Sequence, residues 1–243
     1  MNLNNSICLV TGAAKRVGRS IALHFARHGA IVIVHHCHSQ GEAHATAKEC
    51  GEYYGREGLP LYADLSDPGE IEDLARAALA AYGRVDVLVN CAAIFAKKSL
   101  LETSLVEWDK FMNVNLRSAA WLSRALAPSM QELQRGVIVN IADSFATQTP
   151  RAGYTPYSVS KAGLISLTQC MAQEFAPHIR VNAVCPGIVA PRAGNDSDRE
   201  FAEKAALVQH AGLPDDVASA CAFLVENDYM NGACIAVDGG KAL

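Results

Sequence analysis

Tyr157 and Lys161 stand four residues apart in the segment Tyr-Ser-Val-Ser-Lys. On a helix this spacing places both side chains on one face, so that the ammonium can lie near the phenol and lower its pKa. Such a tyrosine can act as an acid near neutral pH. The pair therefore predicts a proton donor, Tyr157, activated by Lys161. The same spacing also occurs on solvated helix faces, so the companions of the pair decide its meaning.

Three groups accompany the pair. Asp143 and Ser144 follow one strand-like segment, and Asn90 follows another, with Phe95 shortly after it. Asn115 lies inside a helical run, where a carboxamide is a poor helix former unless it has another task. Because ligands bind beyond the carboxyl ends of parallel strands, these side chains are expected to meet at one edge of a sheet.

A glycine-rich turn follows the first strand-like segment and leads directly into a helical run. Small residues allow a tight turn and a close backbone approach to a pyrophosphate, while the helix N-terminus favours its negative charge. A glycine-rich turn alone is a weak signal, but its place between a strand and a helix strengthens it. The turn spans Gly12, Ala13, Ala14, Lys15, Arg16, Val17 and Gly18.

The end of the second strand-like segment favours NADPH over NADH. A fold that selects NAD usually has an acidic residue there for the ribose 2′-hydroxyl, but this chain has His38 and Ser39. These side chains could hydrogen-bond a 2′-phosphate, and Lys15 and Arg16 add positive charge nearby. A metal site in the run His-His-Cys-His is disfavoured, because neighbours on a strand point to opposite faces.

The chain of 243 residues alternates buried strands and helices. Strand-like runs too continuous to alternate in polarity predict a parallel sheet covered on both faces, a doubly wound α/β (Rossmann) fold. We expect strands at 7–11, 30–36, 59–63, 85–90, 136–142, 179–184 and 233–237, and helices at 18–28, 42–54, 68–82, 105–130, 157–175 and 214–225.

No linker or repeat divides the chain, so residues 1–243 are predicted to form one domain, with the polar stretch within 190–212 as a substrate lid. Hydrophobic residues make up 50% of the chain and the formal net charge is -4, so nothing in its composition indicates nucleic-acid or membrane binding. Without a signal-like N-terminal segment, the protein is expected to be cytoplasmic. No metal ligand set is predicted.

Together these motifs resemble the short-chain dehydrogenase/reductase family, and the resemblance covers essentially the whole chain. It implies a seven-stranded parallel sheet, hydride transfer from a nicotinamide to a C=O or C=N bond, and a homotetramer. It also implies that Lys161 holds the nicotinamide ribose and Asn115 anchors a proton-relay water. The implied cofactor-binding residues are Gly12, Lys15, Arg16, Val17, Gly18, His38, Ser39, Asp64, Leu65, Asn90, Ala92, Tyr157, Lys161, Pro186, Gly187 and Ile188.

Two departures from the family pattern resemble pteridine and dihydromonapterin reductases. Arg16 stands where the family usually has a glycine, and counting forward from Asn140 places Asp143 where it usually has a catalytic serine. Counting back from Tyr157 reaches Ser144 instead, so both remain catalytic candidates. The resemblance implies that Arg16, Phe95, Asp143 and Tyr157 contact the substrate.

The leading hypothesis is therefore an NADPH-dependent reductase of a pterin or dihydropterin C=N bond. The alternative is a reductase of a 3-oxoacyl thioester or another carbonyl compound, supported by Ser144 and the general family motifs. A protein that binds NADPH without turnover is a third possibility. The joint presence of Asn115, Tyr157 and Lys161 argues against it, because a binding protein has no need of an acid and its activator.

Overall fold

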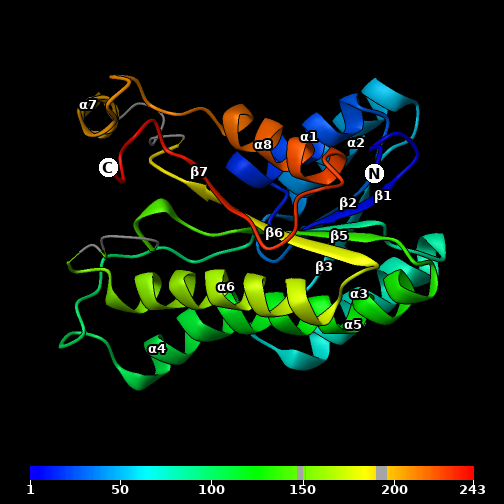
Figure 1. Ribbon diagram of the computed structural model, residues 1–243, viewed down its shortest axis with the longest axis horizontal. Coiled ribbons are helices and arrows are strands. Elements are labelled where there is room, and N and C mark those ends of the chain that lie inside the picture. The colour runs from blue at the N-terminus through cyan, green and yellow to red at the C-terminus, as the bar shows by residue number, and fades with distance from the viewer. Residues whose placement is uncertain (147–149, 151, 190–195) are drawn as a thin grey trace.

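A single parallel sheet forms the centre of the computed structural model, which describes residues 1–146, 150, 152–189 and 196–243 (Figure 1). In this part of the chain the sheet has seven strands in the order β3-β2-β1-β4-β5-β6-β7. Every neighbouring pair is parallel, so the predicted doubly wound fold is confirmed. The strands are β1 (Ile7–Val10), β2 (Ile31–His36), β3 (Leu59–Tyr62), β4 (Val87–Asn90), β5 (Gly136–Ile141), β6 (Ile179–Pro186) and β7 (Cys234–Val237).

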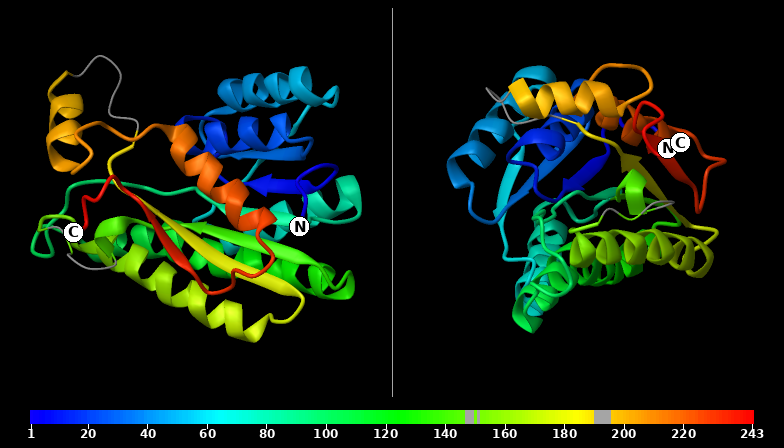
Figure 2. Two further views of the ribbon diagram at one scale, coloured as in Figure 1. Left: turned by 45° about the horizontal axis from the view of Figure 1, so that its top comes forward. Right: turned by 90° about the vertical axis from the view of Figure 1, so that its left-hand side faces the viewer.

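Helices cover both faces of the sheet (Figures 1 and 2). One face is covered by α1 (Arg16–Arg27), α2 (Gln40–Tyr54) and α8 (Pro214–Glu226). The other is covered by α3 (Pro68–Tyr82), α5 (Ser118–Glu132) and α6 (Thr155–Glu174), with α4 (Leu105–Met112) packed on α6. The sheet is thus the middle layer of three.

The strands are apolar along their length because both faces are buried. In β1, Cys8 and Val10 face the core beneath α1 and α8, whereas Ile7 and Leu9 face the core beneath α3 and α5. All four residues are at most 4% exposed. Continuous burial explains why the sequence pattern of this strand lacks the alternation of a half-exposed sheet.

Two helical predictions were wrong. The run expected at 105–130 is interrupted by a π-helical turn (Asn113–Arg117) between α4 and α5. Such widened turns commonly occur at functional sites, and Asn115 is buried within this one. The polar stretch expected to be irregular contains the helix α7 (Asp196–Ala205). Its polar composition is that of a solvated helix, while residues 190–195 lie outside the described part of the chain.

The strand order brings the candidate side chains together. From β1 the chain winds outward to β2 and β3 and then returns to add β4 on the other side of β1. In such a sheet a crevice opens at the carboxyl ends of the two strands where the winding reverses, and ligands bind there. The turns after β1, β4 and β5 all lie along this edge of the sheet.

The opposite edge is held by a buried carboxylate, Asp86. It accepts hydrogen bonds from the backbone N–H of Ile7 (2.8 Å), from Arg84 (3.0 Å) and from Arg135 (2.7 Å). Burial would raise the pKa of Asp86, but these three donors outweigh it and lower the pKa below its ordinary value. The ionised side chain therefore ties the starts of β1 and β5 to β4.

Asp86→Asn should lower the free energy of unfolding by about 2 kcal/mol at pH 7, because a neutral amide makes poorer hydrogen bonds to two arginines. Because the pKa of Asp86 is lower in the folded than in the unfolded state, its ionised side chain stabilises the fold above about pH 4. This stabilisation is lost as the pH falls from there through the folded-state pKa. Denaturant unfolding from pH 7 to pH 3 should thus show a smaller acid loss in the variant. The exposed pair Asp73–Arg76 provides a control, Asp73→Asn, and equal stability of both variants would contradict this account.

Candidate active site and cofactor cradle

The glycine-rich turn after β1 has the geometry of a phosphate cradle. Gly12 adopts φ +65°, and a Cβ there would lie 3.0 Å from the Cα of Ala92. A Cβ on Gly18 would lie 2.3 Å from the carbonyl oxygen of Gly12. Both positions therefore require glycine, the first for its conformation and for contact with the β4 turn, and the second for close packing of α1 on the turn.

The N-terminus of α1 suits an anion. The helix begins at Arg16, its first turn carries no acidic residue, and the side chain of Lys15 at the N-cap makes no capping hydrogen bond. Unsatisfied N–H groups and the helix dipole both favour negative charge at this place. The residues present therefore fit a dinucleotide pyrophosphate.

Arg16 adopts a left-handed backbone conformation, with φ +51°. This conformation costs an L-residue about 1–2 kcal/mol and favours glycine. The turn thus retains the backbone shape of a glycine at a position occupied by arginine. We infer that the side chain has a task that outweighs this strain.

Two side chains anchor the turn to neighbouring strands. Thr11 accepts hydrogen bonds from the backbone N–H groups of Cys91 (2.9 Å) and Ala92 (3.0 Å), which fixes the loop after β4. His35 accepts from the N–H of Gly12 at 3.0 Å. Neither Thr11 nor His35 was among the predicted site residues. A hydroxyl at the very end of a buried strand was the available signal for Thr11.

The predicted adenosine end of the cradle lies beyond β2 and β3. Asp64 accepts from both the backbone N–H and the hydroxyl of Ser66, each at 2.8 Å, which shapes the loop beside the buried Leu65. His38 is exposed, and Ser39, the N-cap of α2, makes no side-chain capping bond.

Lys15 forms an ion pair with Glu42 of α2 at 2.6 Å. Part of the positive charge predicted for a 2′-phosphate is therefore already balanced by a carboxylate.

Asp143 is the side chain that faces Tyr157. The phenol of Tyr157 donates to Asp143 Oδ2 at 2.8 Å, and the N–H of Phe145 donates to Asp143 Oδ1 at 2.9 Å. Ser144 is fully buried in the short 3₁₀ turn (Ser144–Ala146) that follows. Of the two catalytic candidates, Asp143 is thus the one in hydrogen-bond contact with the phenol.

The predicted lowering of the tyrosine pKa is wrong for this structure. Burial raises the pKa of Tyr157 well above its ordinary value, and both the charge of Asp143 and its hydrogen bond raise it further. The sequence spacing correctly places Lys161 on the same helix, with its Nζ 6.0 Å from the centroid of the Tyr157 ring. It could not show that a carboxylate lies closer to the hydroxyl than the ammonium does.

Lys161 is held at the end of β5. Its side chain is 3% exposed, and Nζ donates to the carbonyl oxygen of Ile141 at 2.6 Å. Burial lowers the pKa of Lys161, while the nearby Cys91, Asp143 and Cys185 act to raise it. The hydrogen bond fixes the first turns of α6 against the strand that leads to Asp143.

Asn115 connects the β4 loop to α6. Its carboxamide accepts from the N–H of Ile94 (2.8 Å) and donates to the carbonyl of Ile94 (3.0 Å) and to Ser160 (3.1 Å). Ser160 in turn donates to the carbonyl of Tyr157 at 2.7 Å. The side chain therefore positions the tyrosine, and its predicted role as a water anchor stays a prediction.

The side chain of Asn90 helps to join two strands to α6. Its Nδ2 donates to Asn140 Oδ1 at 2.9 Å, and Asn140 donates to Thr168 at 2.8 Å. This buried chain of amides joins β4 and β5 to α6. Since the Asn90 side chain lies 6% exposed among these groups, its predicted contact with the cofactor remains untested.

An aromatic cluster lies beside the phenol. Phe95 is 64% exposed, stacks on Tyr154 with ring centroids 5.1 Å apart, and meets the edge of Tyr157 at 4.8 Å. The sequence predicted Phe95 as a substrate contact but not Tyr154. An aromatic side chain in the loop that leads into α6 was the only signal for it. The cluster offers an exposed aromatic face close to the predicted proton donor.

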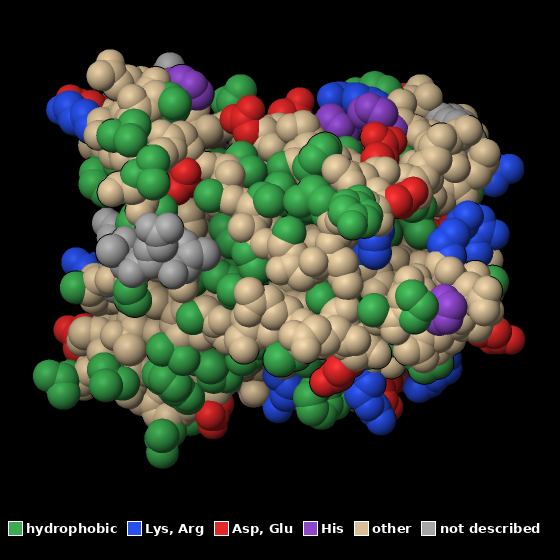
Figure 3. Space-filling view, in the orientation of Figure 1, with side chains coloured by type: hydrophobic (Ala, Val, Ile, Leu, Met, Phe, Trp, Pro, Cys, Tyr) green, Lys and Arg blue, Asp and Glu red, His purple; other side chains and the backbone are tan. Residues whose placement is uncertain are grey.

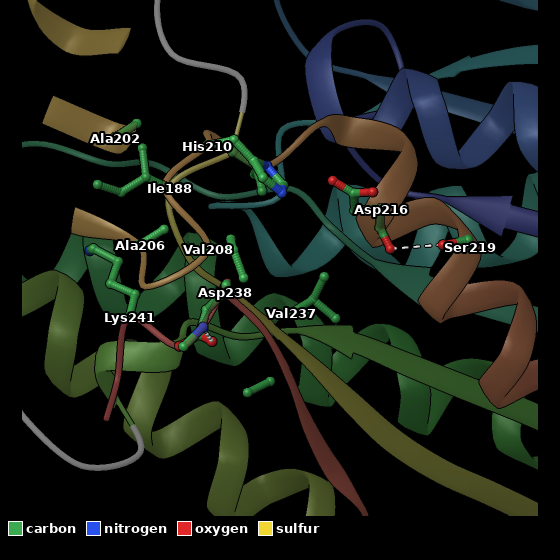
Figure 4. A pocket seen from close by; sticks show the side chains of 15 residues that line it. Ile188, Ala202, Ala206, Val208, His210, Asp216, Ser219, Val237, Asp238 and Lys241 are labelled. Atoms are coloured by element: carbon green, nitrogen blue, oxygen red, sulfur yellow. Dashed lines mark hydrogen bonds between the residues drawn. The ribbon is translucent and has the colours of Figure 1, made fainter. Parts of the chain in front are cut away.

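The segment after β6 borders a cavity of about 460 Å³ (Figure 4). Gly187 is required there, since a Cβ would lie 2.7 Å from that of Asp238, and its N–H donates to the carbonyl of Val237 at 3.0 Å. Ile188 lines the cavity together with part of the predicted lid. The C-terminal segment also reaches the active site, because Lys241 Nζ lies 3.4 Å from the centroid of the Phe145 ring.

Among the described residues, no group of three or more His, Cys, Asp or Glu side chains is arranged to hold a metal ion. Within the same residues, every helix is too short or too polar to cross a membrane.

Comparison with known proteins places this site in a family. Residues 12–242 match the family model described as enoyl-(acyl carrier protein) reductase, a model of short-chain dehydrogenases and reductases. The chain belongs to the short-chain dehydrogenase/reductase family. The seven-stranded parallel sheet is thus that of a family member.

Curated relatives share about a third of their residues with the chain. The 3-oxoacyl-[acyl-carrier-protein] reductase FabG of Thermotoga maritima is 34% identical over 254 residues, which cover 100% of each protein. FabG of Escherichia coli is 33% identical, covering 99% of this chain and 98% of the relative. A (2S)-[(R)-hydroxy(phenyl)methyl]succinyl-CoA dehydrogenase subunit, BbsD of Thauera aromatica, is 32% identical over 100% of this chain and 99% of its own.

A solved structure is closely similar in fold. A blue fluorescent protein from a metagenomic library, crystallised with NADPH, has a TM-score of 0.91 and 31% identity, with 100% of both chains covered.

Replacing Arg16 with glycine or alanine should separate backbone strain from side-chain function. Both variants should bind NADPH about tenfold more weakly, because both lack the guanidinium beside the phosphate turn. Arg16→Gly should be more stable than Arg16→Ala by about 1 kcal/mol, since glycine adopts φ +51° without strain. Fluorescence titration and denaturant unfolding measure the two effects. Equal stability of the two variants would contradict the assignment of strain.

Proposed function

We propose that the protein is an NADPH-dependent reductase that transfers a hydride to a C=N bond of a pterin or dihydropterin. The observation that carries this proposal is the 2.8 Å hydrogen bond from the phenol of Tyr157 to Asp143. It supports a site whose proton donor is paired with a carboxylate.

A carboxylate and a serine favour different substrates. A carboxylate accepts hydrogen bonds, so Asp143 suits the amino and ring N–H groups of a pterin. A carbonyl substrate develops oxyanion charge as it is reduced and needs a neutral donor such as a serine hydroxyl. A carboxylate at that place would repel this charge. The chemistry of Asp143 therefore supports a nitrogen heterocycle over a ketone.

The aromatic cluster supports the same substrate class. Phe95 is largely exposed and makes a T-shaped contact with the ring of Tyr157, so a substrate that reached Phe95 would be close to the phenol ring. Flat aromatic faces stack favourably on planar heterocycles. A pterin stacked there would keep its ring plane near both the phenol and Asp143.

The residues of the site then have distinct tasks. NADPH, when bound, supplies the hydride. Tyr157 would supply the proton to the ring nitrogen, which requires its O–H to turn from Asp143 to the substrate. Because burial and Asp143 raise the pKa of Tyr157 in this structure, bound ligands would have to lower that pKa for the transfer. Asp143 accepts from the phenol and orients it, while Lys161 places positive charge beneath the site from its anchor on Ile141.

NADPH is proposed over NADH on the basis of charge. No acidic residue lies between β2 and α2, and His38 and Ser39 stand in the segment where a fold that selects NAD usually has a carboxylate for the ribose 2′-hydroxyl. Lys15 and Arg16 lie at the N-terminus of α1 beside the predicted pyrophosphate site. A solved relative in this fold is described as a complex with NADPH.

A second candidate is the reduction of a 3-oxoacyl thioester. The curated relatives named above favour it, since two of them are 3-oxoacyl-[acyl-carrier-protein] reductases. Ser144 would then be the catalytic hydroxyl, which requires it to turn from its buried position toward the substrate. The pairing of an acid with a carboxylate in the site argues against the third possibility, a binding protein without turnover.

Replacing Asp143 and Ser144 one at a time distinguishes the pterin reductase from the thioester reductase. If the pterin proposal holds, Asp143→Asn should lower kcat/KM for dihydrobiopterin at least 100-fold, whereas Ser144→Ala should retain activity within about tenfold. NADPH oxidation followed by absorbance measures both, with Tyr157→Phe as the blank. Loss of all turnover in Ser144→Ala with full activity in Asp143→Asn would contradict the proposal and support the thioester reductase.

We also propose that the protein assembles as a homotetramer, as its family resemblance implies. Exposed apolar side chains gather over α4 and the segment before it, at the lower left of Figure 3. Such a patch is typical of a subunit interface. It includes Leu100, Leu101, Leu105 and Val106.

Leu101→Glu combined with Leu105→Glu should lower the molar mass in solution, because two buried carboxylates per copy would oppose association. Light scattering coupled to size-exclusion chromatography measures this mass. A wild-type protein that elutes as a monomer would contradict the proposed assembly.

A further inference from the structure

His35 holds the backbone of the phosphate turn at two points. Its Nδ1 accepts from the N–H of Gly12 at 3.0 Å, and its own carbonyl oxygen accepts from the N–H of Ala13 at 3.0 Å. The paired register of β1 and β2 ends at Val10 and Val34. His35 thus extends the connection between these strands into the turn itself.

The other ring nitrogen of His35 contacts the opposite part of the cradle. Nε2 lies 3.0 Å from the carbonyl oxygen of Ala63, the residue that directly precedes Asp64 and Leu65. Because a carbonyl can only accept, Nε2 carries the hydrogen, and Nδ1 is then the acceptor for Gly12. Burial lowers the pKa of His35 to about 4, so the imidazole is neutral and keeps both bonds at neutral pH.

The imidazole ring of His35 is buried, so the loss of either hydrogen bond would cost free energy. His35 is 2% exposed, so water cannot replace a lost partner without entering the core. A buried N–H left without an acceptor costs about 1–3 kcal/mol. The charge of the neighbouring His36 also lowers the pKa of His35.

We propose that His35 is a positioning residue that couples the two halves of the cofactor cradle. It holds the pyrophosphate turn through Gly12, and through Ala63 it holds the loop after β3 at 63–65, which we call the adenine loop. The inference rests on the dinucleotide cofactor proposed above. Because His35 is 2% exposed, it would act through these two protein segments and not by contact with the cofactor. It sets the distance between the two protein segments that do, so that both can engage one NADP molecule.

Asparagine and glutamine test the two bonds separately. The amide of asparagine reaches the position of Nδ1, so His35→Asn keeps an acceptor for Gly12 and loses the donor to Ala63. The amide of glutamine reaches the position of Nε2, so His35→Gln keeps the donor and loses the acceptor. His28→Gln, an exposed histidine at the end of α1, is the matched control.

Calorimetric titration measures the affinity for NADP⁺, which would engage both halves of the cradle, and for adenosine 2′-phosphate, which would engage only the half at the adenine loop. His35→Gln should weaken NADP⁺ about tenfold and leave adenosine 2′-phosphate within about twofold, because only the turn is released. His35→Asn should weaken both ligands by a similar factor of about ten, since the adenine loop is shared. His28→Gln should bind both ligands like the wild type.

Several outcomes would overturn the proposal. Binding of both ligands within twofold of wild type by both variants would show that His35 has no role in the cradle. Equal weakening of both ligands by His35→Gln would show that it does not act through the turn. Binding that is lost only in proportion to the unfolded fraction at the assay temperature, as thermal unfolding measures it, would show a role in stability alone. Failure of the wild type to bind NADP⁺ would instead reject the proposed cofactor.

Discussion

The hydrogen bond between Tyr157 and Asp143 joins the two elements that carry the chemistry, the end of β5 and the start of α6. The remaining contacts of the site support this one. Lys161 binds the last carbonyl of β5, Ser160 holds the backbone of Tyr157, and Asn115 links that turn to the loop after β4. Because these bonds are buried or partly buried, they hold the phenol before a substrate arrives, which lowers the cost of orienting the reacting groups.

The cofactor cradle is organised in the same manner on the other side of the crevice. Thr11 holds the loop after β4, and His35 holds both the glycine turn and the loop after β3. The cradle and the catalytic turn therefore meet in the β4 loop, which Thr11 binds on one side and Asn115 binds on the other. A displacement of that loop would disturb both sites together.

The sequence was sufficient to predict the fold and to name several of the side chains that lie together in the candidate site, such as Asp143, Tyr157 and Lys161. Continuous apolar runs indicated the buried parallel strands, and the order of motifs along the chain located the glycine turn and the Tyr157–Lys161 pair. What it could not supply depends on tertiary contacts. The pKa of Tyr157 is set by burial and by Asp143, fourteen residues away, and the choice between Asp143 and Ser144 required the direction of each side chain.

His35 and Thr11 escaped prediction because their partners are backbone groups of distant strands, which no local pattern reveals. The π-helical turn around Asn115 was missed because its composition resembles that of an ordinary helix. The helix α7 was missed because a polar, charged stretch occurs in solvated helices and in loops alike.

The proposed reduction of a nitrogen heterocycle depends on the carboxylate paired with Tyr157, within a family whose named relatives include reductases of 3-oxoacyl thioesters. The most direct measurement is the kcat/KM of the wild-type protein for dihydrobiopterin and for an acetoacetyl thioester, each with NADPH in parallel assays. We expect kcat/KM for the pterin to exceed that for the thioester by at least about 100-fold, which is equivalent to roughly 3 kcal/mol of transition-state stabilisation. Turnover of the thioester with none of the pterin would contradict it and would identify Asp143 as an incidental partner of the catalytic tyrosine.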